Sequence, residues 1–211
     1  MPERERLLSE LADENAVGVL LLAQMGGTPN ELQLFIQTAQ YDDAAQGLRE
    51  RGNYIIRVLN TQEHRLSLGL FGSLFIAEEH PILLHHNEPK VAVFFTGTPA
   101  DVNELVLDIH QAYASTFGPW RELVADINRE MPLVDLLKSG AGRLGTMPKT
   151  AAERMVRVLQ HHQLAARLDV EGSREASDGH GRSMLWKLLG VGDSYFVALD
   201  FAVDKMGKQP G

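Results

Sequence analysis

Residues 53–96 constrain the fold more than any other part of the chain, because short strand-like runs and turn signals follow one another there. Leu66, Leu68 and Leu70 alternate with polar or small residues, which is typical of a strand with one solvated face. The run 91–95 is apolar at every position and predicts a central strand. Since short strands joined by tight turns run in opposite directions, this region predicts an antiparallel sheet.

Helical and hairpin patterns flank this strand-rich run. Apolar periodicity and breaker residues predict helices over residues 3–14, 42–50, 99–117, 120–127, 133–138 and 150–166. The clearest start is Thr98-Pro99, where threonine suits the N-cap and proline suits the first helical position. Two hairpins are expected, one pairing 17–24 with 31–38 and the other pairing 184–190 with 194–203.

Together these elements predict an α+β fold with a mainly antiparallel sheet packed against several helices. The main α+β domain is expected at residues 1–130. Residues 131–211 hold a helical segment and the C-terminal hairpin, which either belong to the same domain or form a small winged-helix-like unit. Because strand residues are apolar on both faces, the second face must also be covered, by the N-terminal helix or by another subunit. A homodimer is therefore a hypothesis.

Composition and charge limit the classes of function. The chain has 211 residues, no cysteine and a formal net charge of −8. The absence of cysteine excludes disulfides, thiolate metal ligands and cysteine nucleophiles. No apolar run approaches the roughly 20 residues that span a bilayer, and the charged N-terminus lacks the apolar core of a signal peptide. We therefore expect a cytoplasmic protein that does not enter a membrane.

Histidines and carboxylates gather in the strand-rich run and suggest a metal site. The candidate ligands are His64, His80, His85, His86, Glu78 and Glu79. Imidazole and carboxylate groups suit Zn²⁺, Fe²⁺ or Mn²⁺, and three such ligands with an open position can activate water. The spacing matches no established motif, so the alternative is that these side chains cap strand ends and face solvent.

The glycine-rich run 140–145 has the formal pattern G-x-G-x-x-G just before a predicted helix. Glycines at this spacing let backbone N–H groups approach a phosphate, but the dinucleotide motif must directly follow a strand. Here the preceding residues are helical in pattern. The run therefore predicts a turn between two helices, and no cofactor is assigned to it.

Basic residues concentrate near the C-terminus. Residues 138–190 carry nine basic and five acidic side chains, whereas the chain as a whole is acidic. Arg154 and Arg157 share one face of the helix predicted at 150–166, and Arg182 follows in a polar loop. In a winged-helix-like unit such residues would contact nucleic-acid phosphates. The alternative is an ordinary solvated helix face.

No recognisable catalytic constellation accompanies this well-specified fold. The favoured hypothesis is therefore a non-enzymatic binding or regulatory protein that recognises a small ligand or a protein partner. A metal-dependent enzyme built on the His/Glu residues and a nucleic-acid-binding protein are the two alternatives.

Overall fold

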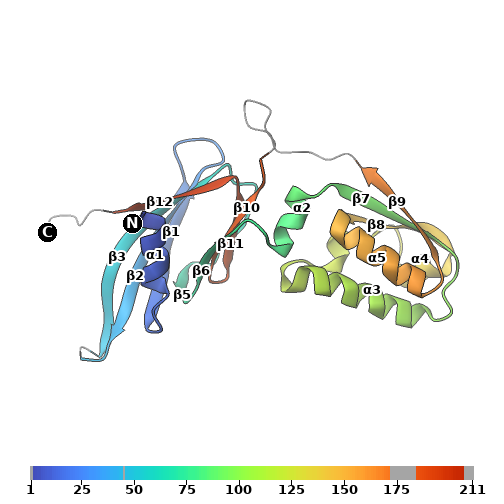
Figure 1. Cartoon of the computed structure of the whole chain (residues 1–211), viewed down its shortest axis with the longest axis horizontal. Coiled ribbons are helices and arrows are strands. Elements are labelled where there is room, and N and C mark those ends of the chain that lie inside the picture. The colour runs from blue at the N-terminus through green and yellow to red at the C-terminus, as the bar shows by residue number, and fades with distance from the viewer. Residues whose placement is uncertain (1, 45, 172–183, 207–211) are drawn as a thin grey trace. The chain divides into compact units, whose positions relative to one another are not determined.

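The computed structural model describes residues 2–44, 46–171 and 184–206 and separates into two compact units (Figure 1). Unit 1 comprises residues 1–79 and 184–211, and unit 2 comprises residues 80–183. These boundaries differ from the predicted division after residue 130, because the C-terminal strands pair with strands from the first 79 residues. Within the described residues, no helix is long and apolar enough to cross a membrane.

Unit 1 contains helix α1 and two antiparallel sheets, so the predicted α+β class and antiparallel pairing are confirmed. The five-stranded sheet has the order β12-β3-β2-β1-β5 and the four-stranded sheet the order β4-β11-β10-β6. The bounds are α1 Glu3–Leu11, β1 Ala16–Met25, β2 Leu32–Asp42, β3 Gly47–Leu59, β4 Glu63–Arg65, β5 Gly69–Phe71, β6 Leu74–Ala77, β10 Lys187–Val191, β11 Ser194–Ala198 and β12 Asp200–Lys205. Both predicted hairpins, β1–β2 and β10–β11, are present.

One hydrophobic core joins the two sheets and α1. Ile36 and Ile56 come from the larger sheet, Leu189 and Phe196 from the smaller one, and Leu7 from α1. All five side chains are essentially inaccessible to solvent. Burial of side chains of this size contributes about 1.5–3 kcal/mol each, so the shared core is what holds the sheets together.

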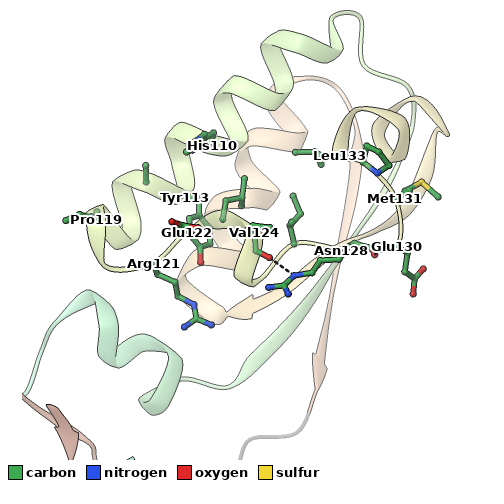
Figure 2. A pocket seen from close by; sticks show the side chains of 16 residues that line it. His110, Tyr113, Pro119, Arg121, Glu122, Val124, Asn128, Glu130, Met131 and Leu133 are labelled. Carbon is green, nitrogen blue, oxygen red and sulfur yellow. Dashed lines mark hydrogen bonds between the residues drawn. The ribbon is translucent and has the colours of Figure 1, made fainter. Parts of the chain in front are cut away.

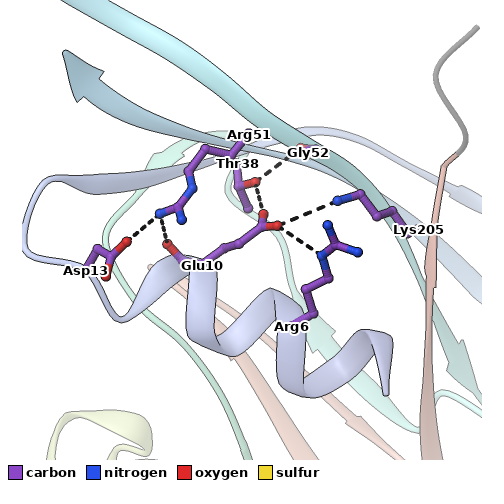
Figure 3. Close-up of polar contacts among 7 residues, drawn as sticks. All are labelled: Arg6, Glu10, Asp13, Thr38, Arg51, Gly52 and Lys205. Carbon is purple, nitrogen blue, oxygen red and sulfur yellow. Dashed lines mark hydrogen bonds and ion pairs between the residues drawn. The ribbon is translucent and has the colours of Figure 1, made fainter. Parts of the chain in front are cut away.

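A buried carboxylate anchors α1 to the larger sheet (Figure 3). Glu10 accepts a hydrogen bond of 2.6 Å from the Thr38 hydroxyl, and its carboxylate lies 3.5 Å from Arg6 and 3.6 Å from Lys205. Burial alone would raise the pKa of Glu10, but the Thr38 and Tyr54 hydroxyls and the nearby cations hold it below its ordinary value. Glu10 is therefore ionised at neutral pH and links α1 to three neighbouring elements.

Two predictions for unit 1 are wrong. The predicted helix at 42–50 is absent from its described residues: Asp42 ends β2 and accepts a hydrogen bond from the Ala44 N–H, Gln46 adopts φ 51°, and residues 47–50 begin β3. The alternating leucines at 66, 68 and 70 do not line the core; all three are exposed. No other described residue covers these three leucines. The homodimer stays a prediction, which sedimentation at micromolar concentration can test.

Unit 2 is a three-stranded antiparallel sheet of order β8-β7-β9 with helices on one face (Figure 1). Its core combines Val93 and Phe95 of β7 with Ile109 of α3 and Met155 of α5. The bounds are η1 Pro81–Leu83, α2 Leu84–Asn87, β7 Lys90–Thr96, α3 Val102–Phe117, η2 Gly118–Trp120, η3 Leu123–Ala125, α4 Leu133–Lys138, β8 Ala141–Pro148, α5 Lys149–His161 and β9 Ala165–Glu171, where η marks a 3-10 turn.

Carboxylates cap the two long helices of unit 2, and the cap of α3 differs from the predicted one. Asp101, and not Thr98, caps α3 by accepting hydrogen bonds from the N–H groups of Asn103 and Glu104. The carboxylate of Glu88 caps α5 by accepting from the Thr150 N–H at 2.8 Å. Helix α5 ends at His161, earlier than predicted, because Gln163 adopts φ 62°.

Two further segments of unit 2 correct the sequence predictions. No α-helix spans residues 120–127, where the structure has the end of η2 and the 3-10 turn η3, and the glycine-rich run 140–145 lies mostly in strand β8 instead of a turn between helices. A winged-helix-like unit is not shown: the helix α5 flanks a sheet whose central strand is β7, and the C-terminal hairpin belongs to unit 1.

Candidate functional site

A pocket of about 1090 Å³ opens in unit 2 between the C-terminal half of α3 and the segment 118–133, hereafter the wall segment (Figure 2). Helix α3 contributes His110, Tyr113 and Ala114. The wall segment contributes Gly118, Pro119, Arg121, Glu122, Leu123, Val124, Ile127, Asn128, Arg129, Glu130, Met131, Pro132 and Leu133. The size suits a small organic ligand, since such sites typically enclose about 300–1,000 Å³.

The wall segment has little regular structure but is fixed to strand β8 by backbone contacts. Ile127 forms a bridge with Gly145, the Thr146 N–H donates to the Asp126 carbonyl at 2.9 Å, and the Asn128 N–H donates to the Leu144 carbonyl at 2.8 Å. A Cβ atom at Gly145 would lie 2.3 Å from the Asp126 carbonyl oxygen. Only glycine permits this approach, so Gly145 serves strand-to-segment packing and not phosphate binding.

A buried polar network around Asp126 joins three elements behind the pocket. The Tyr113 hydroxyl of α3 donates to Asp126 Oδ2 at 2.6 Å, and Arg121 Nη2 donates to Oδ1 at 3.2 Å. His85 Nε2, on α2, lies 2.8 Å from the same Oδ2. Asp126 therefore ties α2, α3 and the wall segment together through one carboxylate.

The electrostatics of this network follow from burial and hydrogen bonding. Burial alone would raise the pKa of Asp126, but the adjacent His85 imidazole and the hydrogen bonds from Tyr113 and Arg121 hold it below its ordinary value. Burial lowers the pKa of His85, although Asp126 opposes this, so the imidazole is neutral at pH 7. Burial and the Asp126 carboxylate together raise the pKa of Tyr113, which stays protonated. The network thus contains one charge pair, Asp126 with Arg121.

Arg129 is held at the pocket by a second set of hydrogen bonds. The Asn128 side chain accepts from the Glu130 N–H at 2.9 Å and donates to the Arg143 carbonyl at 3.1 Å, which fixes the turn that carries Arg129. The Arg129 Nε donates to the Val124 carbonyl at 2.8 Å, the dashed line in Figure 2. The guanidinium is therefore oriented before any ligand arrives.

The pocket surface is mostly apolar with a few charges. Val124 is 53% exposed and Met131 is 41% exposed, although both are large apolar side chains. Arg121 and Arg129 are the cations, and Glu122 and Glu130 are exposed carboxylates at the edge. A rigid apolar surface with oriented polar groups is suited to binding a molecule with an apolar body and a polar end.

The predicted metal ligands of unit 1 make separate local contacts. His64 on β4 stacks against Phe196 with ring centroids 6.2 Å apart. The Glu78 carboxylate lies 3.5 Å from Lys187 Nζ, and Glu79 is exposed.

The predicted ligands of unit 2 also differ in their surroundings. His80 caps η1 by accepting from the Ile82 N–H, and its ring meets the Trp120 ring edge-on at 4.9 Å. His85 and His86 are consecutive on α2, and His85 belongs to the Asp126 network. The described residues contain no group of three or more His, Asp or Glu side chains placed to hold a metal ion. The metal-dependent enzyme stays a prediction, tested by whether His80→Ala removes any stoichiometric metal.

The predicted nucleic-acid contacts are partly described. Arg157 is exposed on α5, and Arg154 on the same helix donates to the Ser115 hydroxyl at 3.0 Å. Arg182 lies outside the described residues. These positions leave the nucleic-acid hypothesis a prediction.

Sequence reasoning missed the residues that form the pocket. Tyr113, Arg121, Asp126 and Arg129 belong to no motif, and the apolar spacing of the wall segment indicated a helix. His110 is exposed at the pocket and likewise belongs to no motif. The one available signal was Gly145, because a glycine in a strand often marks a close backbone approach.

Comparison of the chain with protein-family models, with curated proteins and with solved structures found no match.

Proposed function

We propose that the protein is a non-enzymatic binding protein whose unit 2 pocket takes a small ligand with an apolar body. The observation that carries this proposal is the wall segment, which is rigidly fixed yet exposes apolar side chains. Exposed apolar surface costs free energy in water, and a fixed segment cannot turn these side chains inward. A ligand that covers them recovers that free energy.

Preorganisation supports the same function. The Gly145 contact and the Asp126 and Asn128 hydrogen bonds define the wall before binding, so little conformational entropy is lost when a ligand enters. Loops that carry binding residues on a rigid scaffold are a common arrangement in proteins. Here strand β8 and helix α3 are the scaffold.

The test is a titration of the full chain with N-phenyl-1-naphthylamine, a neutral apolar dye that becomes fluorescent in apolar sites. We expect saturable binding of one dye per chain. The near-isosteric double variant Val124→Thr/Met131→Gln should weaken it at least tenfold, because each change removes about 1 kcal/mol of apolar burial. Met25→Gln is the matched control, since Met25 is 66% exposed in unit 1. Equal loss in both variants, or no saturable binding, would remove the proposal.

A second proposal is nucleic-acid binding through the outer face of α5, as in a winged-helix-like unit. The observation that favours it is that Arg157 and His161 are exposed on that helix. It predicts an affinity that falls steeply with salt, because phosphate contacts release counterions. Binding that is absent, or unchanged in Arg154→Gln/Arg157→Gln, would exclude this role for α5.

A further inference from the structure

We infer that the ligand of the pocket is an amphipathic carboxylate whose anionic end is bound by Arg129. This inference rests on the proposed binding function and adds the chemical class of the ligand. It follows from the orientation of the Arg129 guanidinium and from the ion pairing and exposure of the other charged side chains at the pocket.

Arg129 uses only part of its hydrogen-bonding capacity. Its Nε–H is occupied by the Val124 carbonyl. Across the described ranges 2–44, 46–171 and 184–206, no carboxylate lies within ion-pair distance of its guanidinium. The two terminal nitrogens therefore remain available. A guanidinium presents such N–H groups in a plane that matches the two oxygens of a carboxylate.

The turn that carries Arg129 explains why this cation can act as a fixed anchor. Three hydrogen bonds hold Asn128: its N–H to Leu144, its side-chain amide to the Arg143 carbonyl, and its side-chain oxygen from the Glu130 N–H. An arginine side chain normally loses considerable rotamer entropy when it binds. Here the Val124 hydrogen bond restricts the side chain before the ligand arrives, which favours tighter binding.

The other charged groups at the pocket differ in whether they form an ion pair and in how exposed they are. Arg121 is compensated by Asp126, whose side chain is only 5% exposed. Glu122, Glu130 and Arg129 are all exposed, so water weakens the effect of each of these charges on a bound group. Arg129 differs from the two carboxylates because a hydrogen bond to the Val124 carbonyl orients its guanidinium, so the oriented charge at the pocket that makes no ion pair with a described residue is positive. Val124, the residue whose carbonyl holds Arg129, also presents an apolar side chain, so an anionic end and an apolar body fit side by side.

The experiment displaces N-phenyl-1-naphthylamine from the full chain with three ten-carbon ligands below their micelle concentrations. Decanoate, decan-1-ol and decyltrimethylammonium share one chain and differ in charge. We expect decanoate to bind about tenfold more tightly than decan-1-ol, since one charged hydrogen-bonded contact contributes roughly that factor. Decyltrimethylammonium should bind most weakly.

Variants separate the anchor from general charge. In Arg129→Gln, decanoate should fall to the affinity of decan-1-ol, while decan-1-ol itself is unchanged, which also shows that the pocket is intact. Arg129→Lys should be intermediate, because it keeps the charge but loses the planar fork. Arg157→Gln, which removes an exposed arginine of α5 outside the pocket, is the matched control and should behave as wild type.

The outcomes distinguish the claim that the pocket binds an apolar ligand from the claim that this ligand is a carboxylate. Displacement by none of the three ligands would overturn the proposed binding function and this inference with it. Equal displacement by decanoate and decan-1-ol would overturn only the carboxylate. Tightest binding of decyltrimethylammonium would show that Glu122 and Glu130 dominate, and would also overturn it. Loss of the preference for decanoate in Arg157→Gln would show that Arg129 is not the residue that binds the carboxylate, and would overturn the inference.

Discussion

Gly145 on strand β8 lies directly against the backbone of Asp126, so close that a Cβ atom at residue 145 would come 2.3 Å from the Asp126 carbonyl oxygen. The same Asp126 presents its carboxylate to His85, Tyr113 and Arg121. Asp126 is thus fixed through its main chain by a glycine and through its side chain by the Tyr113 and Arg121 donors, with the His85 imidazole 2.8 Å from the same carboxylate. The shape of the pocket depends on this arrangement.

Gly145→Ala should therefore destabilise unit 2 by about 2–3 kcal/mol, because the new methyl group meets main-chain atoms that cannot move aside. The measurement is a urea titration followed by Trp120 fluorescence in a Trp186→Phe background, which leaves one tryptophan in the chain. Gly142→Ala is the control on the same strand. There the added Cβ would lie 2.9 Å from the end of the Leu136 side chain and 3.8 Å from the Phe95 ring, and no main-chain atom is among these contacts. A cost at Gly142 equal to that at Gly145 would contradict this account.

Asp126→Asn should lower the free energy of unfolding of unit 2 by about 3 kcal/mol. The substitution keeps the side-chain volume but removes the buried negative charge that the surrounding donors face. The comparison is Asp108→Asn. Asp108 lies 2.8 Å from His162, the same distance as Asp126 from His85, but its side chain is 34% exposed against 5% for Asp126. We expect a loss below about 1 kcal/mol there. Similar losses at both positions, measured in the same Trp120 assay, would show that burial of the carboxylate is not the deciding factor.

The stability of unit 2 should fall as the pH is lowered below 6.5. Burial holds the pKa of His85 below its ordinary value of 6.5, so in this range the unfolded chain binds a proton that the folded chain does not. His80 contributes in the same direction, because burial also lowers its pKa. His85→Gln should make the dependence of the unfolding free energy on pH shallower, and His161→Gln, at an exposed position, is the control. Stability that rises as the pH falls through this window would contradict the assignment.

Glu10→Gln should destabilise unit 1 by about 1–2 kcal/mol, because the neutral amide is a weaker partner for Thr38, Arg6 and Lys205. Trp186 fluorescence in a Trp120→Phe background reports on this unit. The pKa of Glu10 lies below 4.5, so the difference from wild type should be full above pH 4.5 and shrink as the pH falls further. Glu5→Gln, on the exposed face of α1, should change little. Equal effects of the two substitutions would indicate that Glu10 is not an anchor.

The sequence predicted elements whose signals are local. The β1–β2 and β10–β11 hairpins have short turns between apolar runs, and α4 was predicted with its observed bounds, Leu133–Lys138. The failures concern segments whose conformation is set by distant partners. Residues 141–145 form part of strand β8 because β7 pairs with it across more than 40 residues of chain, and glycine patterns carry no information about that pairing.

The pocket could not be predicted from the sequence either, because distant partners set the conformation of its wall segment. The spacing of Leu123, Val124 and Ile127 suits one face of a helix and therefore predicts one. In the structure these side chains line the pocket, because contacts of Ile127 with Gly145 and of Asn128 with the Arg143 carbonyl hold the segment against β8 in a non-helical conformation. Asp126 is an ordinary acidic residue in the sequence. Only the fold brings His85, Tyr113 and Arg121 to it.

The most direct test of the account is an NMR titration of the ¹³C-methyl methionine-labelled chain with N-phenyl-1-naphthylamine, whose aromatic rings shift nearby methyl resonances. Met131 lines the pocket, Met147 and Met155 are fully buried in the core of unit 2, and Met25 is exposed in unit 1. We expect a saturable shift of the Met131 methyl resonance, while the resonances of the other three methionines stay in place. A shift at Met25 with none at Met131 would show that the apolar ligand binds elsewhere.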